Sequence, residues 1–232
     1  MAERVRVKIC GLVRREDALV ADRAGADYLG VILSPGFGRS VNPTDAAHIV
    51  SGTRARKVAV LVDETAEAAE AAAVTLGADV LQLHGAEDPS VLRELRARGS
   101  WRIWKAVLAR SIFDVERTVE RYAGLADGIL VEGWKEGGPG RGGARLTLEP
   151  DRVRSSIPRS LDFVLAGGLD AETVSEAVAS FGPEVVDVSS GVERSVGVKE
   201  HDVVRTFIDA ARGLDVASAP RVPESPAPGR AR

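Results

Sequence analysis

Short apolar runs alternate with longer amphipathic segments along most of the chain. The runs have the length and composition of buried β-strands, and the segments between them have helical periodicity. Eight strands are predicted at Val5–Ile9, Tyr28–Leu33, Lys57–Val62, Val80–Leu83, Ile103–Val107, Gly128–Val131, Phe163–Ala166 and Val185–Val188. Eight helices are predicted at Arg15–Arg23, Thr44–Val50, Thr65–Leu76, Pro89–Arg98, Ile112–Tyr122, Asp151–Ser156, Ala171–Ser180 and Glu200–Arg212.

Residues that begin and end helices support several of these boundaries. Asn42 and Asp88 each precede a proline, which puts a capping side chain just before a first helical turn. Gly25, Gly77 and Gly99 follow helical segments, where a left-handed stop favours glycine.

Eight repeats of strand and helix predict parallel strands joined by right-handed crossovers. The arrangement that fits is a single α/β domain, a (β/α)8 TIM barrel, which typically needs about 200–250 residues; the chain has 232. The alternative is an open doubly wound sheet, which usually has fewer repeats and a glycine-rich turn after its first strand. Here the first run ends in Cys10-Gly11 without that fingerprint. We therefore expect a barrel over residues 1–213.

Residues 214–232 differ from the rest of the chain. Four prolines and almost no large apolar side chains leave this segment unable to form a packed element. We expect a disordered C-terminal tail.

Composition narrows the class of protein. Hydrophobic residues make up 44% of the chain and charged residues 28%, which is ordinary for a soluble globular protein. The net charge of −3 carries no basic footprint for nucleic acid. Neither a secretory signal nor the roughly 18 consecutive apolar residues of a membrane span is visible. A single cysteine excludes an intrachain disulfide and is typical of a reducing compartment, so we expect a cytoplasmic protein.

Two long glycine-containing loops follow the second and sixth runs, at Ser34–Ser40 and Gly133–Gly143. Both are expected at the C-terminal rim of the barrel, where barrel enzymes keep their sites. Their glycines indicate mobile covers or close approach of the backbone to a ligand. The alternative is a loose surface excursion.

Polar side chains gather on the predicted inner face of the barrel, toward the strand ends. Side chains alternate between the two faces of a strand, and the apolar face should pack on the helices. The polar set is Lys8, Cys10, Gln82, His84, Lys105, Glu132, Asp187 and Ser189. Buried charges need partners, so this set either pairs internally or faces a polar ligand. We favour the ligand, because so many of these residues lie at one end.

A thiol and a carboxyl group in this set suggest acid–base chemistry. Cys10 ends the first run with Lys8 on the same face, and a nearby ammonium would favour the thiolate. Glu132 ends the sixth run, well round the barrel, so the two form a base–acid pair with room for a substrate between them. The alternatives are a small buried hydrophobe at Cys10 and an ion pair of Glu132 with Lys105 or Lys8. His84 is either a third titrating group or a simple hydrogen-bond donor.

Two turns follow the seventh and eighth runs, where barrels often bind phosphate. Backbone N–H groups and serine hydroxyls can surround anionic oxygens there. The predicted phosphate-binding residues are Gly167, Gly168, Ser189, Ser190 and Gly191. The alternative is a pair of tight turns that merely allow helices to pack.

Metal and cofactor signatures are missing from the sequence. The three histidines and one cysteine lack ligand spacing. Neither a P-loop nor a dinucleotide fingerprint is present, so we expect no metal and no cofactor.

Several motifs together resemble one family, the phosphoribosylanthranilate isomerases of tryptophan biosynthesis. The likeness covers nearly the whole chain to about residue 212 and leaves out the tail. The motifs that carry it are Lys8–Leu12, Ser34-Pro35, Arg39-Ser40, Gln82–Gly85, Leu165–Leu169, Asp187–Glu193 and Gly197–Lys199.

This resemblance implies a cofactor-free Amadori rearrangement. The substrate would be N-(5-phosphoribosyl)anthranilate, a small phosphorylated sugar amine, and the product 1-(2-carboxyphenylamino)-1-deoxyribulose 5-phosphate. By analogy, Cys10 is the base that removes the C2 proton, and the acid that protonates the ring oxygen ends the sixth run. Arg39 would hold the anthranilate carboxylate or order its loop, with Lys8 and His84 as further substrate-binding residues. A monomer or a homodimer is expected.

The chain departs from the family at the acid, where Glu132 stands in place of an aspartate. The following loop runs from Gly137–Gly140 into Arg141 without the family's threonine and aromatic residue, and Trp134 and Phe37 are expected to reshape the anthranilate side. Two alternatives therefore stay open. One is the same rearrangement on a different N-glycoside, and the other is a non-catalytic barrel that binds phosphate.

Overall fold

A ring of eight parallel strands forms the centre of the molecule in the computed structural model, which describes residues 4–135 and 144–213. The strands close in chain order, and β1 pairs with both β2 and β8. They are β1 (Arg6–Ile9), β2 (Tyr28–Ile32), β3 (Arg56–Leu61), β4 (Val80–Leu83), β5 (Arg102–Ala109), β6 (Gly128–Gly133), β7 (Asp162–Leu165) and β8 (Val185–Val188). This closure confirms the predicted (β/α)8 barrel and excludes the open sheet.

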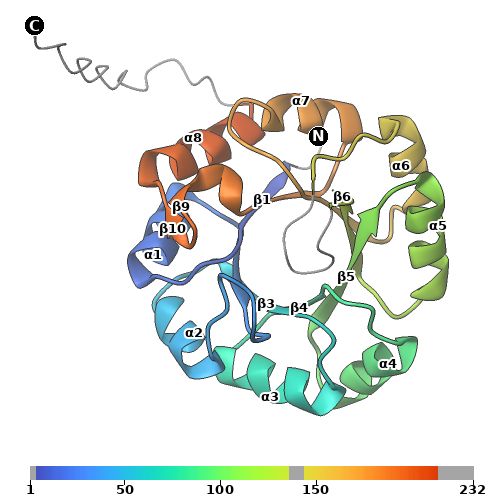
Figure 1. Ribbon diagram of the computed structural model, residues 1–232, viewed down its shortest axis with the longest axis horizontal. Coiled ribbons are helices and arrows are strands. Elements are labelled where there is room, and N and C mark those ends of the chain that lie inside the picture. Colours follow the sequence, from blue (N-terminus) through green and yellow to red (C-terminus); the bar gives the residue numbers. More distant parts are fainter. Residues whose placement is uncertain (1–3, 136–143, 214–232) are drawn as a thin grey trace, which may run out of the picture.

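Helices surround the ring on its outside (Figure 1). They are α1 (Arg15–Ala24), α2 (Pro43–Ile49), α3 (Ala66–Leu76), α4 (Pro89–Arg98), α5 (Ile112–Arg121), α6 (Pro150–Ser156), α7 (Val174–Phe181) and α8 (His201–Ala211). All eight predicted helices are present, with ends that differ by a few residues. The predicted tail and residues 136–143 of the predicted loop after β6 lie outside the described residues.

The predicted caps explain most of these helix boundaries. Asn42 Oδ1 accepts a hydrogen bond from the N–H of Asp45 at 2.9 Å, and Asp88 Oδ1 accepts one from Ser90 N–H at 2.9 Å. Gly25 ends α1 in the left-handed conformation. Gly99 does not, because its φ of −164° is extended backbone. The left-handed stop predicted there is wrong, and a Cβ at this position would instead meet the ring of Trp101.

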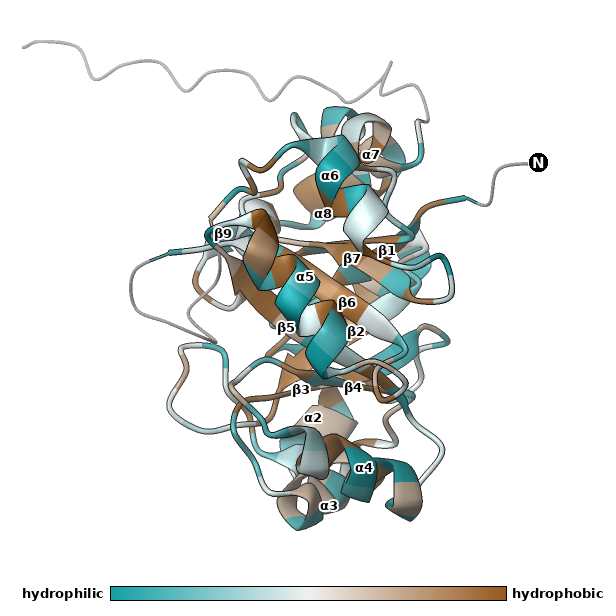
Figure 2. Cartoon of the chain, turned by 90° about the vertical axis from the view of Figure 1, so that its right-hand side faces the viewer, coloured by the Kyte–Doolittle hydropathy of each residue, from teal (hydrophilic) through white to brown (hydrophobic). Residues whose placement is uncertain are grey.

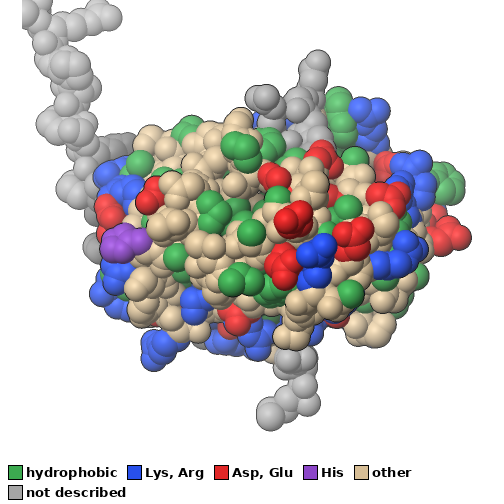
Figure 3. Space-filling model, turned by 90° about the horizontal axis from the view of Figure 1, so that it is seen from below, with side chains coloured by type: hydrophobic (Ala, Val, Ile, Leu, Met, Phe, Trp, Pro, Cys, Tyr) green, Lys and Arg blue, Asp and Glu red, His purple; other side chains and the backbone are tan. Residues whose placement is uncertain are grey.

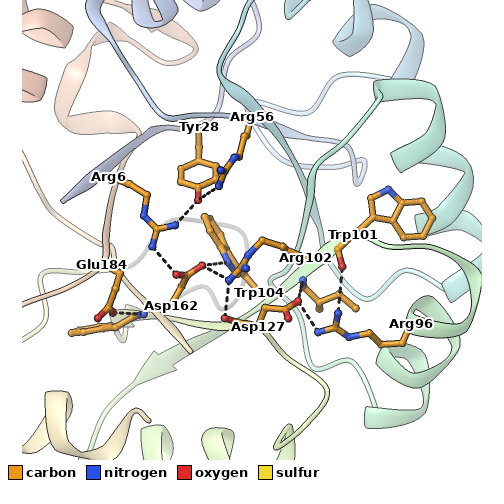
Figure 4. Close-up of polar contacts among 12 residues, drawn as sticks. Arg6, Tyr28, Arg56, Arg96, Trp101, Arg102, Trp104, Asp127, Asp162 and Glu184 are labelled. Carbon is orange, nitrogen blue, oxygen red and sulfur yellow. Dashed lines mark hydrogen bonds and ion pairs between the residues drawn. The ribbon is translucent and has the colours of Figure 1, made fainter. Parts of the chain in front are cut away.

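A polar network closes the N-terminal end of the barrel (Figure 4). The Tyr28 hydroxyl oxygen accepts hydrogen bonds from Arg6 Nη1 at 2.9 Å and Arg56 Nη1 at 3.1 Å. The Asp162 carboxylate accepts bonds from Arg6 at 2.6 Å and Arg102 at 2.7 Å. Since Arg6, Arg56, Arg102 and Asp162 are the first residues of β1, β3, β5 and β7, the odd-numbered strands are tied together at their starts.

A second repeated hydrogen bond links neighbouring strands in pairs. The carboxylate just before each even-numbered strand accepts a hydrogen bond from the N–H of the second residue of the preceding strand. The pairs are Asp27 with Val7 at 2.8 Å, Asp79 with Lys57 at 2.7 Å, Asp127 with Ile103 at 2.7 Å, and Glu184 with Phe163 at 2.8 Å. Each bond satisfies a backbone donor at the start of a strand, so four strand pairs share one local construction.

The core has an outer layer between strands and helices and an inner layer within the barrel. Figure 2 shows apolar strands at the centre and helices that carry both polar and apolar residues. The apolar residues inside the barrel are Cys10, Tyr28, Val58, Val60, Val80, Trp104, Ala106, Leu130, Val164, Ala166 and Val185. The predicted inner faces of β1, β4, β6 and β8 agree with this set.

The predicted face of β5 is wrong. Trp104 and Ala106 point into the barrel, so Lys105 points outward toward the helices. Trp104 packs edge-on against Tyr28 with ring centroids 4.9 Å apart, and the two rings fill the N-terminal part of the barrel. Lys105 Nζ finds oxygens behind the strand, including Gly85 O at 2.8 Å and the carboxylate of Glu87 at 3.2 Å. The large aromatic side chain of Trp104 therefore takes the interior position on β5, and Lys105 takes the outer one.

An additional hairpin follows β8. A 3-10 turn, η1 (Ser190–Val192), leads into two short antiparallel strands, β9 (Glu193–Ser195) and β10 (Val198–Lys199), which were not predicted. This hairpin brings Glu193 and Lys199 to the C-terminal rim. Its shortness explains why strand periodicity did not reveal it.

The loop Ser34–Ser40 is tied down, which does not favour the mobile cover expected there. Ser34 Oγ donates to Glu64 at 2.8 Å, and Ser40 Oγ donates to the carbonyl of Ser34 at 2.6 Å. Ser40 also forms an isolated β-bridge with Ile32. These contacts fix the position of Arg39, which lies within the loop.

The outer surface carries charges of both signs. On the face shown in Figure 3, Lys and Arg side chains are interspersed with Asp and Glu, and apolar side chains are scattered among them. Among the described residues, the helices are all too short or too polar to cross a membrane.

Candidate active site

A cavity of about 250 Å³ opens at the C-terminal end of the barrel strands. Cys10 and Glu132, predicted as base and acid, both line it. So do Arg39 and His84. The remaining wall includes all five predicted phosphate-binding residues: Gly167, Gly168, Ser189, Ser190 and Gly191. The structure therefore brings together groups from the ends of β1, β4, β6, β7 and β8 and from the loop after β2.

Lys8 lies beneath this cavity rather than in its wall. Its side chain is completely buried, and Nζ donates a hydrogen bond to Asp187 Oδ2 at 2.9 Å. Burial alone would lower the pKa of Lys8, but the Asp187 carboxylate and the Cys10 thiol raise it above its ordinary value. Lys8 is thus a buried ammonium paired with Asp187, a placement that does not favour the direct substrate contact predicted for it.

The Cys10 thiol is held mainly in its neutral form in the free protein. Burial raises the pKa of Cys10, and the Asp187 carboxylate raises it further. The ammonium groups of Lys8 and Lys199 act in the opposite direction without overcoming burial. The predicted effect of Lys8 on the thiol is therefore present, but the net shift is toward the thiol and not the thiolate.

Gly30 leaves the space that Cys10 and Lys8 occupy. It is an inward-facing position of β2, and a Cβ there would lie 2.9 Å from Cys10 Sγ and 2.9 Å from Lys8 Cε. Such distances are shorter than real Cβ contacts allow. The absence of a side chain at Gly30 therefore lets the Cys10 thiol and the Lys8 ammonium sit side by side.

Glu132 ends β6 and takes part in a hydrogen-bond chain. His84 Nε2 lies 2.8 Å from Glu132 Oε1, and Gln82 Nε2 lies 2.8 Å from His84 Nδ1. The two lysines considered as partners of Glu132 have other carboxylates, since Lys8 pairs with Asp187 and Lys105 with Glu87. His84 thus contacts the predicted acid directly.

Arg39 is held in a bidentate ion pair at the opposite side of the rim. Its Nε and Nη2 donate to the two Glu193 carboxylate oxygens at 2.8 and 2.6 Å. Lys199 Nζ donates to Glu193 Oε1 at 2.8 Å and to the carbonyl of Ser189 at 3.0 Å. Burial would raise the pKa of Glu193, but the hydrogen bonds from Arg39 and Lys199 hold it below its ordinary value. Glu193 therefore links the Arg39 loop to the turn after β8.

The two glycine turns, residues 167–168 and 189–191, follow the neighbouring strands β7 and β8, and both line the cavity. Gly167 and Gly168 have φ values of +85° and +61°, which favour glycine. A Cβ at Gly191 would collide with the carbonyl oxygen of Leu169. Successive backbone N–H groups in turns of this kind can bind an anion.

Gln82 and Asp187 line the cavity although no role was predicted for them. Both belonged to the expected inner polar set, and that alternation was the signal available in the sequence. Glu193 and Lys199 lay within the recognised motifs but were given no role, because their contacts depend on the β9–β10 hairpin. Lys135 also lines the cavity.

Trp134 and Phe37 do not line the cavity wall. Trp134 is 41% exposed and stacks against the Arg110 guanidinium, with Arg110 Cζ 4.0 Å from the ring centroid. The expectation that these aromatic residues reshape the pocket is thus not supported by their placement. Within the described part of the chain, no cluster of His, Cys, Asp and Glu could hold a metal ion.

Comparisons with known proteins agree with this geometry. The family model of N-(5'-phosphoribosyl)anthranilate (PRA) isomerase matches residues 7–210. The N-(5'-phosphoribosyl)anthranilate isomerase of Afipia carboxidovorans is 39% identical over 223 residues, which cover 95% of each chain.

Solved structures of the same name are also similar. A phosphoribosyl anthranilate isomerase from Thermotoga maritima has 34% identity and a TM-score of 0.77, over 90% of this chain and 100% of that one. A phosphoribosyl anthranilate isomerase in complex with reduced 1-(o-carboxyphenylamino)-1-deoxyribulose 5-phosphate has 33% identity, the same TM-score and the same coverage. The barrel, its rim groups and these matches together show that the chain belongs to the N-(5'-phosphoribosyl)anthranilate isomerase family.

Proposed function

We propose that this protein converts N-(5'-phosphoribosyl)anthranilate to 1-(2-carboxyphenylamino)-1-deoxyribulose 5-phosphate, a step of tryptophan biosynthesis, by acid–base catalysis. The observation that carries the proposal is one cavity lined by a thiol, a carboxyl group and two glycine turns. The relative crystallised with the reduced product supports the choice of substrate.

Glu132 acts first, as the acid. It gives a proton to the ribose ring oxygen while the C1–O bond breaks, which opens the ring and leaves a protonated imine between C1 and the anthranilate nitrogen. His84, 2.8 Å from Glu132, supports the carboxylate that remains. A positioned acid or base contributes roughly 10²–10⁴-fold to the rate of such a step.

Cys10 acts second, as the base. Once it has lost its own proton, Cys10 takes the proton from C2 as a thiolate, and the electrons of that C–H bond form the C1=C2 double bond of an enolamine. The enolamine becomes the ketone when its C2 hydroxyl loses a proton and C1 gains one. The enzyme gives one proton to the substrate and receives one from it, so exchange with solvent restores the starting state. Lys8 supports the thiolate from below, and its ion pair with Asp187 fixes it there.

The two glycine turns bind the phosphate group through backbone N–H groups and the hydroxyls of Ser189 and Ser190. Lys199 adds positive charge behind Ser189, with its Nζ 3.0 Å from the carbonyl of that residue. Arg39 holds the anthranilate carboxylate. Its ion pair with Glu193 keeps the guanidinium at the cavity wall.

The partner is thus a small phosphorylated sugar amine. The reaction needs a free thiol at Cys10, which favours a reducing compartment such as the cytoplasm. A Thermotoga maritima relative is described as dimeric, and for this chain a monomer or a homodimer is proposed.

Turnover of the purified protein tests the function. Wild-type protein should consume N-(5'-phosphoribosyl)anthranilate, whereas Cys10→Ala and Glu132→Gln should lose at least about a hundredfold in kcat. The wild-type gene should also restore growth to a tryptophan auxotroph that lacks this step. Soluble, folded protein without turnover or complementation would contradict the proposal.

A second candidate is the same rearrangement on a different N-glycoside. Glu132, in place of the family's aspartate, is the observation that favours it. A folded but inactive wild type would bring this candidate forward.

A further inference from the structure

Gln82, His84 and Glu132 form a buried chain of hydrogen bonds across the inside of the barrel. Both contacts in the chain are 2.8 Å long. The three residues are only 1%, 8% and 4% exposed, respectively. Because bulk water cannot replace these contacts, each of them needs a proton between its two heavy atoms.

The chemistry of the amide decides where those protons lie. A side-chain amide nitrogen donates hydrogen bonds and does not accept them. With Gln82 Nε2 against it, His84 Nδ1 is the acceptor, so the proton of the neutral imidazole is on Nε2. Nε2 then donates to Oε1 of the Glu132 carboxyl group.

We propose that Gln82 is a positioning residue for the acid step, because it fixes the tautomer of His84 and so keeps a hydrogen-bond donor directed at Glu132. This inference rests on the proposed function, in which Glu132 gives its proton to the ring oxygen. When the carboxylate forms, its donor is already in place. Preorganised donors at a developing charge lower the barrier without reorganisation.

The backbone around His84 is fixed as well. Lys105 Nζ donates to the carbonyl of Leu83 at 3.2 Å and to that of Gly85 at 2.8 Å. These residues flank His84 in the chain, and the Lys105 side chain is buried. The imidazole is therefore anchored from behind, and its tautomer is the property that Gln82 controls.

Nuclear magnetic resonance reads that tautomer directly. The chain has three histidines, one glutamine (Gln82) and one asparagine (Asn42), so imidazole and side-chain amide signals of ¹⁵N-labelled protein are few. Loss of one imidazole in His84→Asn assigns the His84 signals. We expect a bare Nδ1 and a protonated Nε2 at neutral pH. A proton on Nδ1, in a neutral or a cationic ring, would overturn the inference.

Two variants connect the tautomer to the rate. Gln82→Glu places an acceptor against Nδ1 and should move the proton there. Gln82→Met removes the amide donor that fixes the tautomer of His84 and should give a mixture of tautomers. We expect kcat to fall about tenfold or more in both, a part of the roughly 10²–10⁴-fold contributed by a positioned acid. KM should stay within about twofold, since the lost interaction acts in the transition state.

Three results would contradict the role of Gln82. The first is that Gln82→Glu leaves the tautomer of His84 unchanged. The second is that the tautomer changes but kcat does not. The third is that only KM changes, which would make Gln82 a substrate contact. Gln82→Met keeps the test open if the buried charge of Gln82→Glu prevents folding. Asn42→Asp, the same chemical change at the exposed cap of α2, is the matched control and should leave tautomer and kcat unchanged.

A failure of the proposed function can be distinguished from a failure of the inference about Gln82. If wild-type protein does not turn over N-(5'-phosphoribosyl)anthranilate, or if Glu132→Gln keeps its kcat, then the assignment of the acid is wrong. The tautomer measurement on the wild type still decides what Gln82 does to His84.

Discussion

Arg39 binds Glu193 through two parallel hydrogen bonds of 2.8 and 2.6 Å, and this fork joins the loop after β2 to the hairpin after β8. Charge-assisted bidentate pairs of this kind fix geometry as well as energy. Lys199 donates to the same carboxylate, so one acidic side chain orients two cations at the cavity rim. The positions of both cations therefore depend on Glu193.

Replacing Glu193 by glutamine tests that dependence. Glu193→Gln keeps an oxygen and removes the charge, so Arg39 and Lys199 should lose their fixed positions. We expect KM to rise about tenfold, or about 1.4 kcal/mol, the size of one weakened charged hydrogen bond. Steady-state kinetics measure this effect. An unchanged KM would mean that neither cation needs Glu193 to meet the substrate.

The same pair predicts a dependence of stability on pH. The pKa of Glu193 is lower in the folded protein than its ordinary value, so the folded state favours the carboxylate. The stabilisation is present above the ordinary glutamate pKa of about 4.3 and is lost as pH falls through the lower folded-state value. The Tm difference between wild type and Glu193→Gln should therefore shrink on acidification below that pH. A constant difference would contradict the assigned cause.

Gly30→Ala should damage the base without unfolding the barrel. The added Cβ would lie 2.9 Å from Cys10 Sγ and Lys8 Cε, so both groups must shift. A misplacement of about 1 Å can cost about a hundredfold in rate, and we expect kcat/KM to fall by ten- to a hundredfold. Kinetics on the folded protein measure the loss.

Gly128→Ala is the matched control for that variant. Gly128 also faces inward from an even-numbered strand, but its Cβ would meet Trp104 at the N-terminal end, far from the thiol. This change should lower Tm while the folded fraction keeps its kcat/KM. Equal loss of activity in both variants would show that general strain, and not the position of Cys10, was responsible.

Glu132→Asp restores the residue of the family pattern and separates the two candidate substrates. The shorter side chain draws the carboxyl group away from His84 Nε2, now 2.8 Å from Glu132 Oε1. If the site is built around glutamate, kcat on N-(5'-phosphoribosyl)anthranilate should fall about ten- to a hundredfold. A severalfold increase would instead indicate that the native acid serves a different N-glycoside.

Cys10 should react slowly with electrophiles until the solution is alkaline. Burial raises its pKa, so the rate of iodoacetamide alkylation should climb through a pH above the ordinary thiol value of about 8.5. Mass spectrometry gives an unambiguous reading because the chain has one cysteine. The phosphorylated product should protect the thiol. Rapid alkylation at pH 7 would show that the thiolate already predominates.

Alternation along the strands was enough to predict most of the site. Cys10, Gln82, Glu132 and Asp187 all face inward as expected, because each strand places a polar residue opposite a clearly apolar face. The rule failed at β5, where Trp104 and Lys105 are adjacent and either could have faced the interior. Aromatic packing against Tyr28 decided the face, and this contact joins strands that are distant in the chain.

Long-range contacts also account for what the sequence could not show. Lys8 was expected at the substrate, but it pairs with Asp187. This contact joins the first strand, β1, to the last, β8, and the two strands become neighbours only when the barrel closes. A detectable signal was missed as well. An Ala-Asp pair precedes β2, β4 and β6, at Asp27, Asp79 and Asp127, and each aspartate makes the same backbone bond. That repeat would have predicted paired strands directly.

The pair of Lys105 and Glu87 should contribute strongly to stability. Lys105 Nζ lies 3.2 Å from Glu87 Oε2, and both side chains are nearly inaccessible to solvent. Glu87 Oε1 also accepts hydrogen bonds from the N–H groups of Gly85, at 2.8 Å, and Asp63, at 3.1 Å. Lys105→Met leaves that carboxylate buried without its cation, a change that typically costs about 3–5 kcal/mol. Urea unfolding should show this loss as a lower midpoint.

The double variant Lys105→Met with Glu87→Gln separates the charge from the packing. Glutamine keeps an oxygen for the N–H groups of Gly85 and Asp63 and removes the unpaired charge. We expect the double variant to be more stable than Lys105→Met alone, because breaking a buried pair costs more than replacing both of its members. Two results would contradict this expectation: losses in the free energy of unfolding that add up in the double variant, or a loss of less than about 1 kcal/mol for Lys105→Met. Either would mean that the two side chains act independently and that the loop after β4 is held by its backbone contacts.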